Sequence, residues 1–341
     1  MKILGIETSC DETAAAVVED GRRIVASIVA SQVDLHARYG GIVPEVASRK
    51  HLENIIPVVE AALDASHCTL SDLDALAVTY GPGLAGSLLV GLNVAKALAM
   101  VRSLPLVGVN HLDGHLSAIM VDRTQPAPEF PLIGLVVSGG HTALFQVSAP
   151  GRYRPLGQTL DDAAGEAFDK CAKALGLPYP GGREIEAQAR AGDESAICFP
   201  RPLLDRDDYN FSFSGLKTAV VNYWEKCGRR EEKVPDVAAS FQAAAVEVLV
   251  VKTMRAAQKF GAGGVVVCGG VAANQRLRSA FLAAGETAGI KVQFPAARLC
   301  ADNAAMIAEA GRRLLGEGVR HGWELGPRAV WPLGNGSRED S

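Results

Sequence analysis

The order of apolar and polar positions along the chain predicts strands that alternate with helices. An apolar run starts at Lys2-Ile3-Leu4, and another spans residues 263–270 with glycines at both ends. Apolar residues at three- and four-residue spacing predict helices at 46–65, 86–101, 161–175, 236–260, 274–284 and 304–316. Strands that alternate with helices favour an α/β fold whose sheets are covered by helices.

Two segments of the chain look like copies of one hairpin. Residues 3–18 and 132–147 align at a constant offset of 129, and each is an apolar run, a tight polar turn and a second apolar run. Apolar hairpins also resemble one another by chance, because strands draw on the same few residues. Identities at one offset favour a duplication: Gly5/Gly134, Ser9/Ser138, Thr13/Thr142, Ala14/Ala143 and Val18/Val147. Two turns that present backbone N–H groups would suit a two-lobed phosphate clamp.

Composition is that of an ordinary globular chain. The 341 residues are 48% hydrophobic and 21% charged, which is long enough for two domains. A formal net charge of −4 gives no general attraction to nucleic acid or to an anionic membrane. The seven cysteines form no C-x-x-C pair, which favours free thiols in a reducing compartment.

Two runs without Asp, Glu, Lys or Arg raise the question of a membrane. Residues 75–95 are interrupted by Gly81-Pro82-Gly83, and residues 130–151 by Gly139-Gly140. A helix that faces lipid would not comfortably carry such breaks, so buried strands and turns are the better interpretation. The amino terminus has no signal-peptide pattern, and we expect a cytoplasmic protein without a membrane segment.

The stretch His111-Leu112-Asp113-Gly114-His115 is the strongest chemical signal. Histidines four residues apart lie on one face of a helix and can share a metal ion, which then needs a third ligand from elsewhere. A pair of surface or core histidines is the alternative. Zinc peptidases carry a glutamate after the first histidine, and Leu112 occupies that position, which argues against a peptidase.

Several longer motifs resemble the TsaD family, the transferases that make N6-threonylcarbamoyladenosine in tRNA. They span nearly the whole chain in order: residues 5–13 (GIETSCDET), 39–45 (YGGIVPE), 48–51 (SRKH), 81–83 (GPG), 111–115 (HLDGH), 138–142 (SGGHT), 161–170 (DDAAGEAFDK), 179–182 (YPGG), 211–218 (FSFSGLKT), 269–274 (GGVAAN) and 302–303 (DN).

The resemblance implies a two-lobed fold of the actin/Hsp70 (ASKHA) type. The amino-terminal lobe would comprise residues 1–130 and be joined by the carboxy-terminal helix region 305–330. The second lobe would comprise 131–304 and contain a loop-rich insertion at about 190–232. The last residues, 334–341, are expected to form a disordered tail.

The resemblance also implies ligands and binding residues. Asp302 would join His111 and His115 on one iron or zinc ion per subunit, although its place before a helical pattern otherwise suggests a helix cap. The remaining family positions would bind the substrate: Val136, Val137, Ser138, Gly139, Gly140, Asp169, Gly182, Glu186 and Asn274. Read without the family, the second turn is equally well a simple tight hairpin, and Asn274 a helix cap.

The implied reaction moves a threonylcarbamoyl group from threonylcarbamoyl-AMP to N6 of the adenosine 3′ of the anticodon, position 37. The tRNAs concerned read codons that start with A. Asp11, in the first turn, is the expected acid/base or orienting group, and Glu12 its weaker neighbour, although either could simply hydrogen-bond the turn. His141 and Lys217 are further candidates for phosphate or tRNA contacts, and a solvated role suits both equally.

The expected partners are tRNA, a TsaB-like paralogue and a small TsaE-like ATPase. Three rival functions remain. An ATPase or kinase of the same fold would use the paired turns for ATP, but Mg²⁺ prefers oxygen ligands to histidines. A non-catalytic scaffold of a tRNA-modification complex would not need the metal ligands. A metalloprotease is the third.

Overall fold

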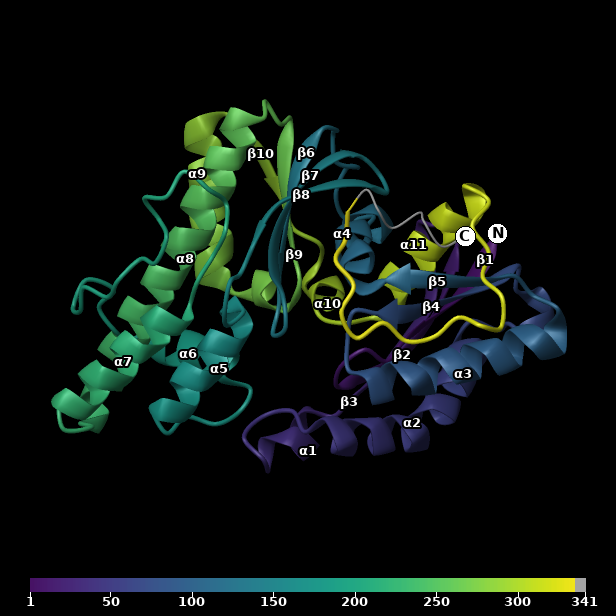
Figure 1. Cartoon of the computed structure of the whole chain (residues 1–341), viewed down its shortest axis with the longest axis horizontal. Helices are drawn as coiled ribbons and strands as arrows, with labels where there is room; N and C mark the ends of the chain where they lie inside the picture. The colour runs from purple at the N-terminus through teal and green to yellow at the C-terminus, as the bar shows by residue number, and fades with distance from the viewer. Residues whose placement is uncertain (335–341) are drawn as a thin grey trace.

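Two five-stranded sheets form the framework of the molecule, and the computed structural model describes residues 1–334 (Figure 1). The tail expected at 334–341 therefore lies outside the described residues, apart from Gly334. The first sheet has the order β3-β2-β1-β4-β5 and contains β1 (Lys2–Glu7), β2 (Glu12–Glu19), β3 (Arg23–Ser31), β4 (Ala75–Gly81) and β5 (Leu106–Asn110). The second has the order β10-β9-β6-β7-β8 and contains β6 (Leu132–Val137), β7 (Thr142–Ala149), β8 (Arg152–Gln158), β9 (Gly264–Cys268) and β10 (Lys291–Gln293).

The two sheets repeat one topology. In each, a three-stranded antiparallel meander is followed by two parallel strands, and the central strand pairs parallel with the fourth. The register of the β1/β2 hairpin recurs in the β6/β7 hairpin. Gly5 faces Ala16, and Gly134 faces Phe145, so both partners shift by the same 129 positions. The predicted duplication therefore describes the actual strand pairing.

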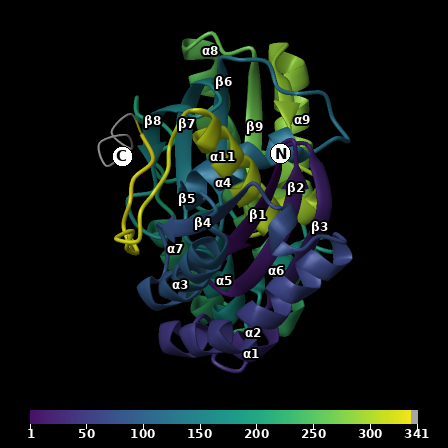
Figure 2. The same cartoon turned by 90° about the vertical axis from the view of Figure 1, so that its right-hand side faces the viewer.

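The first sheet is covered on both faces, because side chains of its strands point alternately to either side. On one face of the sheet, Leu4 and Ile6 belong to a core that is covered by helices. On the opposite face, Ile3 belongs to a second core, which a different pair of helices covers. The helices of the first face are α2 (Pro44–Ala65) and α3 (Ala85–Arg102), and the short α1 (Val33–Ala37) precedes α2. Those of the second face are α4 (His111–Val121) and α11 (Ala304–Gly316), which lie side by side (Figure 2).

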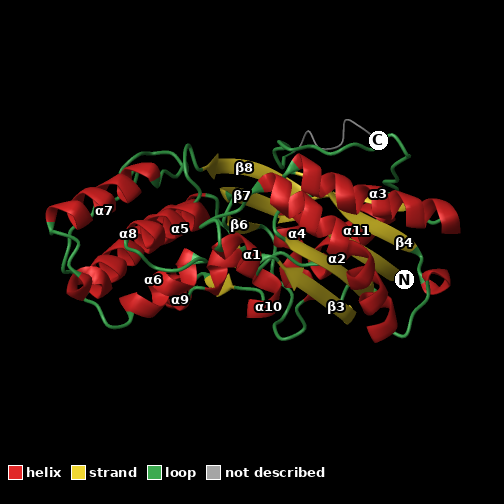
Figure 3. Ribbon diagram, turned by 90° about the horizontal axis from the view of Figure 1, so that it is seen from below, coloured by secondary structure: helices red, strands yellow, loops and turns green. Residues whose placement is uncertain are grey.

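The second sheet carries most of its helices on one face. The large core there is built on Ile133, Leu135 and Val137, while the opposite face packs on α4. Its helices are α5 (Ala164–Ala174), α6 (Gly181–Ala189), α7 (Ser214–Lys226), α8 (Val234–Lys259), α9 (Gln275–Ala288) and α10 (Ala297–Cys300) (Figure 3). The predicted α/β architecture is confirmed, and α4 is the helix that lies between both sheets.

Two expectations about local structure need correction. The helix expected at 161–175 begins at Ala164, because Asp161 instead accepts the backbone N–H groups of Phe213 and Ser214 at the start of α7. The segment expected to be rich in loops, 190–232, contains the 13-residue helix α7. Only its first part, 190–213, runs mainly as turns and loops.

Within residues 1–334, two helices are long and apolar enough to cross a membrane by length and composition alone. They are α3 and the segment Glu231–Lys259, which includes α8. The second is 78% buried inside the fold, as expected for the core helix of a globular protein. Neither coincides with the two uncharged runs, which form strands, turns and only part of α3.

Candidate metal and donor site

Helix α4 is fixed between the two sheets by the apolar residues on both of its sides. Ala118 and Val121 belong to the core under the first sheet, while Leu116 and Ile119 belong to the core under the second. The side chain of Asn110 caps the helix by accepting the N–H of Leu112 at 2.9 Å. A helix held so firmly presents its polar side chains in a fixed direction.

His111, His115 and Asp302 meet at the start of this helix. Nε2 of His111 lies 3.5 Å and Nε2 of His115 lies 3.1 Å from Oδ1 of Asp302. Among the described residues, one ligand atom from each of the three falls within 4.8 Å of the others. Gly114 allows α4 to pack closely on α11, since a Cβ there would lie 2.6 Å from Cδ1 of Ile307.

Asp302 does not cap the following helix. The side chain of Asn303 does so, accepting the N–H of Met306 at 3.1 Å. Asp302 is therefore free to face the two histidines with a side chain that is 17% exposed. The alternative of a capping aspartate, taken from the sequence alone, is wrong.

Glu7, at the end of β1, orients the first histidine and was missed by sequence reasoning. Its Oε2 lies 3.0 Å from Nδ1 of His111 and accepts the Thr79 hydroxyl at 2.6 Å, while Oε1 accepts the N–H of Ser9. The fully buried carboxylate accepts a hydrogen bond from Nδ1–H of His111, and Nε2 then faces Asp302. An acid that ends an apolar strand was the available signal.

The charges around the cluster suit a cation. Burial alone would lower the pKa of His111, but Asp302 and Glu7 outweigh it and raise that pKa to about 9. The pKa of Asp302 is lowered, since burial is opposed by the nearby histidines. Nδ1 of His115 has no hydrogen-bond partner in the described chain. Two imidazoles and one carboxylate are a ligand set that fits an iron or zinc ion, and the Glu7 carboxylate supports one of the imidazoles.

The turn between β1 and β2 carries the two acids predicted to act in catalysis. Asp11 is only 8% exposed. Burial, and then the charge of Asp11, raise the pKa of Glu12 to about 10, and the Ser31 hydroxyl donates to Glu12 at 3.0 Å. Glu12 is therefore protonated at neutral pH and can donate a proton but not accept one.

The equivalent turn of the second sheet is open where the first is acidic. Ser138 holds the turn through two bonds with His141: its N–H donates to the carbonyl at 2.7 Å, and its hydroxyl accepts the N–H at 3.1 Å. A Cβ on Gly139 or on Gly140 would have no atom within 4 Å. Both glycines thus border free space, from which a ligand could reach the backbone N–H groups of the turn.

His141 lies close to the metal cluster without belonging to it. Its ring centre is 6.0 Å from that of His111, and burial lowers its pKa to about 4. The second turn therefore adjoins the metal ligands, as the first does through Ser9, whose hydroxyl lies 3.2 Å from Nδ1 of His111. Lys217, the other candidate, pairs instead with Asp162 at 3.1 Å.

The predicted nucleoside-binding residues lie on α5, α6 and the start of α9. Asp169 accepts the N–H of Gly181 at 2.8 Å, and burial raises its pKa to about 6. A Cβ on Gly182 would meet nothing within 4 Å. Glu186 accepts the N–H of Gln275 at 3.1 Å. These residues border one another, with Gly182 leaving room beside them.

Asn274 caps α9, which is one of the two roles that the sequence allowed. Its side-chain oxygen accepts the N–H of Leu277 at 2.9 Å, and its amide nitrogen donates to Gln242 at 2.8 Å. Val136 and Val137 have fully buried side chains, so only their backbone could contact a ligand. At Asn274, Val136 and Val137 the structure therefore limits which atoms are available to contact a ligand.

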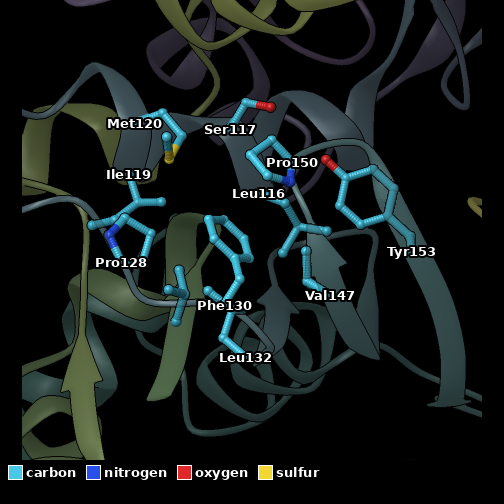
Figure 4. Close-up of a pocket in the computed structure, with 11 residues that line it drawn as sticks. Leu116, Ser117, Ile119, Met120, Pro128, Phe130, Leu132, Val147, Pro150 and Tyr153 are labelled. Carbon is cyan, nitrogen blue, oxygen red and sulfur yellow. The ribbon is translucent and has the colours of Figure 1, made fainter. Parts of the chain in front are cut away.

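A separate small apolar cavity of about 20 Å³ lies between α4 and the second sheet (Figure 4). Leu116, Phe130 and Val147 are among its lining residues. None of the residues predicted to bind the donor or the metal lines it. The cavity therefore belongs to the packing of α4 and not to the site.

Comparison with known proteins identifies the family. A model of the family described as "TsaD: tRNA N6-adenosine threonylcarbamoyltransferase" matches residues 23–309. The chain belongs to the TsaD family. Curated proteins named tRNA N6-adenosine threonylcarbamoyltransferase are 54% identical in Geotalea uraniireducens and 56% in Geobacter sulfurreducens, in each case over 98% of this chain and 97% of the relative. Membership makes the chain a transferase that modifies tRNA, and the predicted family is confirmed.

Solved structures with low sequence identity show the fold alone. HypF of T. kodakarensis is similar with a TM-score of 0.62 and 14% identity, over 92% of this chain and 47% of that protein. Component A of the (R)-2-hydroxyglutaryl-CoA dehydratase of Acidaminococcus fermentans matches with a TM-score of 0.54 and 16% identity, over 93% and 99%. Both are two-lobed ASKHA proteins, and the predicted fold class is confirmed.

Proposed function

We propose that this chain transfers the threonylcarbamoyl group of threonylcarbamoyl-AMP to N6 of adenosine 37 in tRNAs that read codons starting with A. The observation that carries the proposal is the meeting of two unlike turns at one His-His-Asp cluster. The acidic turn, with Asp11, adjoins His111 through Ser9, and the open turn, with Gly139 and Gly140, adjoins it through His141.

In the proposed reaction the N6 amine attacks the carbamoyl carbonyl carbon of the mixed anhydride. A C–N bond forms, the C–O bond to the phosphate breaks, and AMP leaves with the bonding electrons. The proton lost by the amine passes to Asp11, while the protonated Glu12 supports the Asp11 carboxylate. Because the donor is already activated, positioning and electrostatic stabilisation supply most of the rate.

The open turn is the proposed binding site for the donor. Within the run Val136 to Gly140, the N–H of Ser138 already donates to the carbonyl of His141, and Val136 and Val137 pair within the sheet. The N–H groups of Gly139 and Gly140 therefore bind phosphate or carbamoyl oxygens, and the absent side chains of both glycines allow close approach. Asp169, Gly182, Glu186 and Asn274 hold the nucleoside. Carboxylates suit ribose hydroxyls, and Gly182 leaves space for a flat base.

His111, His115 and Asp302 are the proposed ligands of one iron or zinc ion. When bound there, the ion would supply Lewis-acid stabilisation of negative charge on an oxygen of the donor. Glu7 holds the ring of His111, and the packing of α4 keeps both histidines on the same side. Further partners proposed are a TsaB-like paralogue and a TsaE-like ATPase, and the proposed location is the cytoplasm.

The decisive experiment is a transfer assay with labelled threonylcarbamoyl-AMP, tRNA and the two partner proteins. Label is expected in tRNA with an adenosine at position 37, and not in tRNA with guanosine there. The rival ATPase function predicts steady release of ADP from ATP by the pure chain alone. Release of ADP without transfer of label would reject the proposed function.

A further inference from the structure

The acidic turn between β1 and β2 is held by helix α2 and by the residue that follows β3. The carbonyl oxygen of Cys10 lies 3.0 Å from Nε2 of His51 on α2, and the carbonyl of Asp11 accepts the N–H of Gln32 at 3.1 Å. The side chain of His51 is fully buried. The carbonyl before Asp11 is therefore fixed by a helix of the neighbouring layer, and the carbonyl of Asp11 itself by the residue after β3.

The hydrogen bonds of His51 specify its tautomer. A carbonyl oxygen can only accept, so Nε2 must carry the proton that it donates to Cys10. Nδ1 is then an acceptor, and it lies 2.8 Å from the hydroxyl of Thr13, which must donate. Burial is the main reason that the pKa of His51 is lowered, so the ring is neutral. Both bonds require this one tautomer.

Gln32 is held by a second buried histidine. Its side-chain oxygen lies 3.2 Å from Nε2 of His36, and its amide nitrogen donates to the carbonyl of Ala47 on α2. Nδ1 of His36 accepts the N–H of Val43 at 3.4 Å, so Nε2 carries the proton here as well. The support of the turn thus consists of neutral side chains that cannot exchange protons with a substrate.

We propose that His51 is a positioning residue for the transfer reaction. By holding the Cys10 carbonyl it sets the direction in which Asp11, the next residue, presents its carboxylate. His51 itself reaches no substrate, because it is fully buried behind the turn. The inference rests on the proposed role of Asp11. It adds a requirement that the family motifs do not state: α2 must be packed against the acidic turn for Asp11 to be oriented correctly.

Substitutions that differ by one methylene separate the two bonds. Gln places its amide nitrogen near the position of Nε2, whereas Asn reaches only the position of Nδ1. His51→Asn should lower the single-turnover rate by about 10–100-fold, and His51→Gln should retain it within about threefold, with KM for tRNA and metal content unchanged in both. Equal rates for the two variants would overturn the proposal.

A double-mutant cycle with Asp11→Ala tests whether His51 acts through Asp11. In that background His51→Asn should add no further loss, since the group that it positions is gone. A full additional loss there would show that His51 acts by another route and would overturn the inference. Normal transfer by Asp11→Ala alone would instead reject the proposed role of Asp11.

Two measurements remain informative if His51→Asn does not fold. The ¹⁵N resonances of the His51 ring, assigned by their absence in His51→Gln, should report the Nε2–H tautomer. The Nδ1–H tautomer would contradict the proposal. Thr13→Val removes the hydroxyl that donates to Nδ1 and should lower the single-turnover rate by about 3–10-fold, because the ring loses one of its two restraints. An unchanged rate would also contradict it.

Discussion

The two hairpin turns share their framework and differ in almost everything else. Both follow the central strand of a sheet, and their strand registers match at an offset of 129. The first turn holds the buried Asp11 and the half-buried Glu12, and the second has Gly139 and Gly140 beside free space. A phosphate and a carboxylate repel each other. A duplicated framework can therefore serve this transfer reaction only when one turn binds the donor phosphate and the other carries the carboxylates.

The metal cluster lies where the two turns meet, and its loss should have the largest effect. His111→Ala removes a nitrogen ligand and should reduce the metal content from about one ion per chain to a small fraction of that. Elemental analysis of the purified variant measures this. His141→Ala is the matched control, because His141 is the nearby histidine outside the cluster, and its metal content should stay normal. Undiminished metal in His111→Ala would place the ion elsewhere.

The acidic turn should be essential for the rate and dispensable for the fold. Asp11→Ala should lower single-turnover transfer by about 10²–10⁴-fold if Asp11 accepts the proton, while metal content and thermal stability stay close to those of the unmodified protein. Asp11→Asn keeps the shape and the hydrogen bonding but cannot accept a proton. If Asn restores transfer and Ala does not, Asp11 only orients its neighbours.

The sequence predicted the framework well because its signals are local. Periodicity located the helices to within a few residues, and the five identities at one offset identified two hairpins whose strand registers match. The pair His111 and His115 was found because both lie within one helical turn. The third ligand, Asp302, came only from the family resemblance, since nothing near it in sequence distinguishes a metal ligand from a cap.

The supports of the site were not predictable because they join distant segments. Glu7 and His111 are 104 positions apart, and His51 and Cys10 are 41 apart. No local pattern reports such pairs. The protonation of Glu12 depends on burial beside Asp11, which requires the packed structure. The catalytic and metal-binding side chains could therefore be recognised in the sequence, but their hydrogen-bond partners and their burial could not.

The buried carboxylate of Glu7 has no equivalent in the second hairpin, where Val136 occupies the matching position. Glu7→Gln should weaken metal binding by about 10–100-fold, because a neutral amide holds the His111 ring less firmly in the required orientation. Competition with a chelator measures the affinity without reference to activity. Thr79→Val, which removes only the hydroxyl that donates to Glu7, should have a smaller effect. Equal affinity in all three proteins would show that Glu7 does not support the site.

Placing an acid in the open turn tests the division of tasks directly. Gly140 is the counterpart of Asp11 at the offset of 129, and a Cβ there would have no protein atom within 4 Å. Gly140→Asp should therefore fold but bind threonylcarbamoyl-AMP at least about tenfold more weakly, because its charge faces the phosphate. Gly140→Asn has nearly the same shape without the charge and should lose less. Identical losses would mean that space and not charge excludes acids from this turn.

The smallest expected effect concerns the hydroxyl of Ser138, which is also present in the first turn as Ser9. Ser138→Ala removes one hydrogen-bonding group and should weaken binding of threonylcarbamoyl-AMP by about 0.5–1.5 kcal/mol. Part of this loss arises within the turn, since the hydroxyl accepts the N–H of His141. Gly139→Val should weaken binding more, because its branched side chain fills the space that the donor needs while touching no protein atom at its Cβ. Titration calorimetry with threonylcarbamoyl-AMP measures the affinity of each variant and shows which loses more. Unchanged affinity in both would remove the donor from this turn, and the contrast between the two hairpins would then need another explanation.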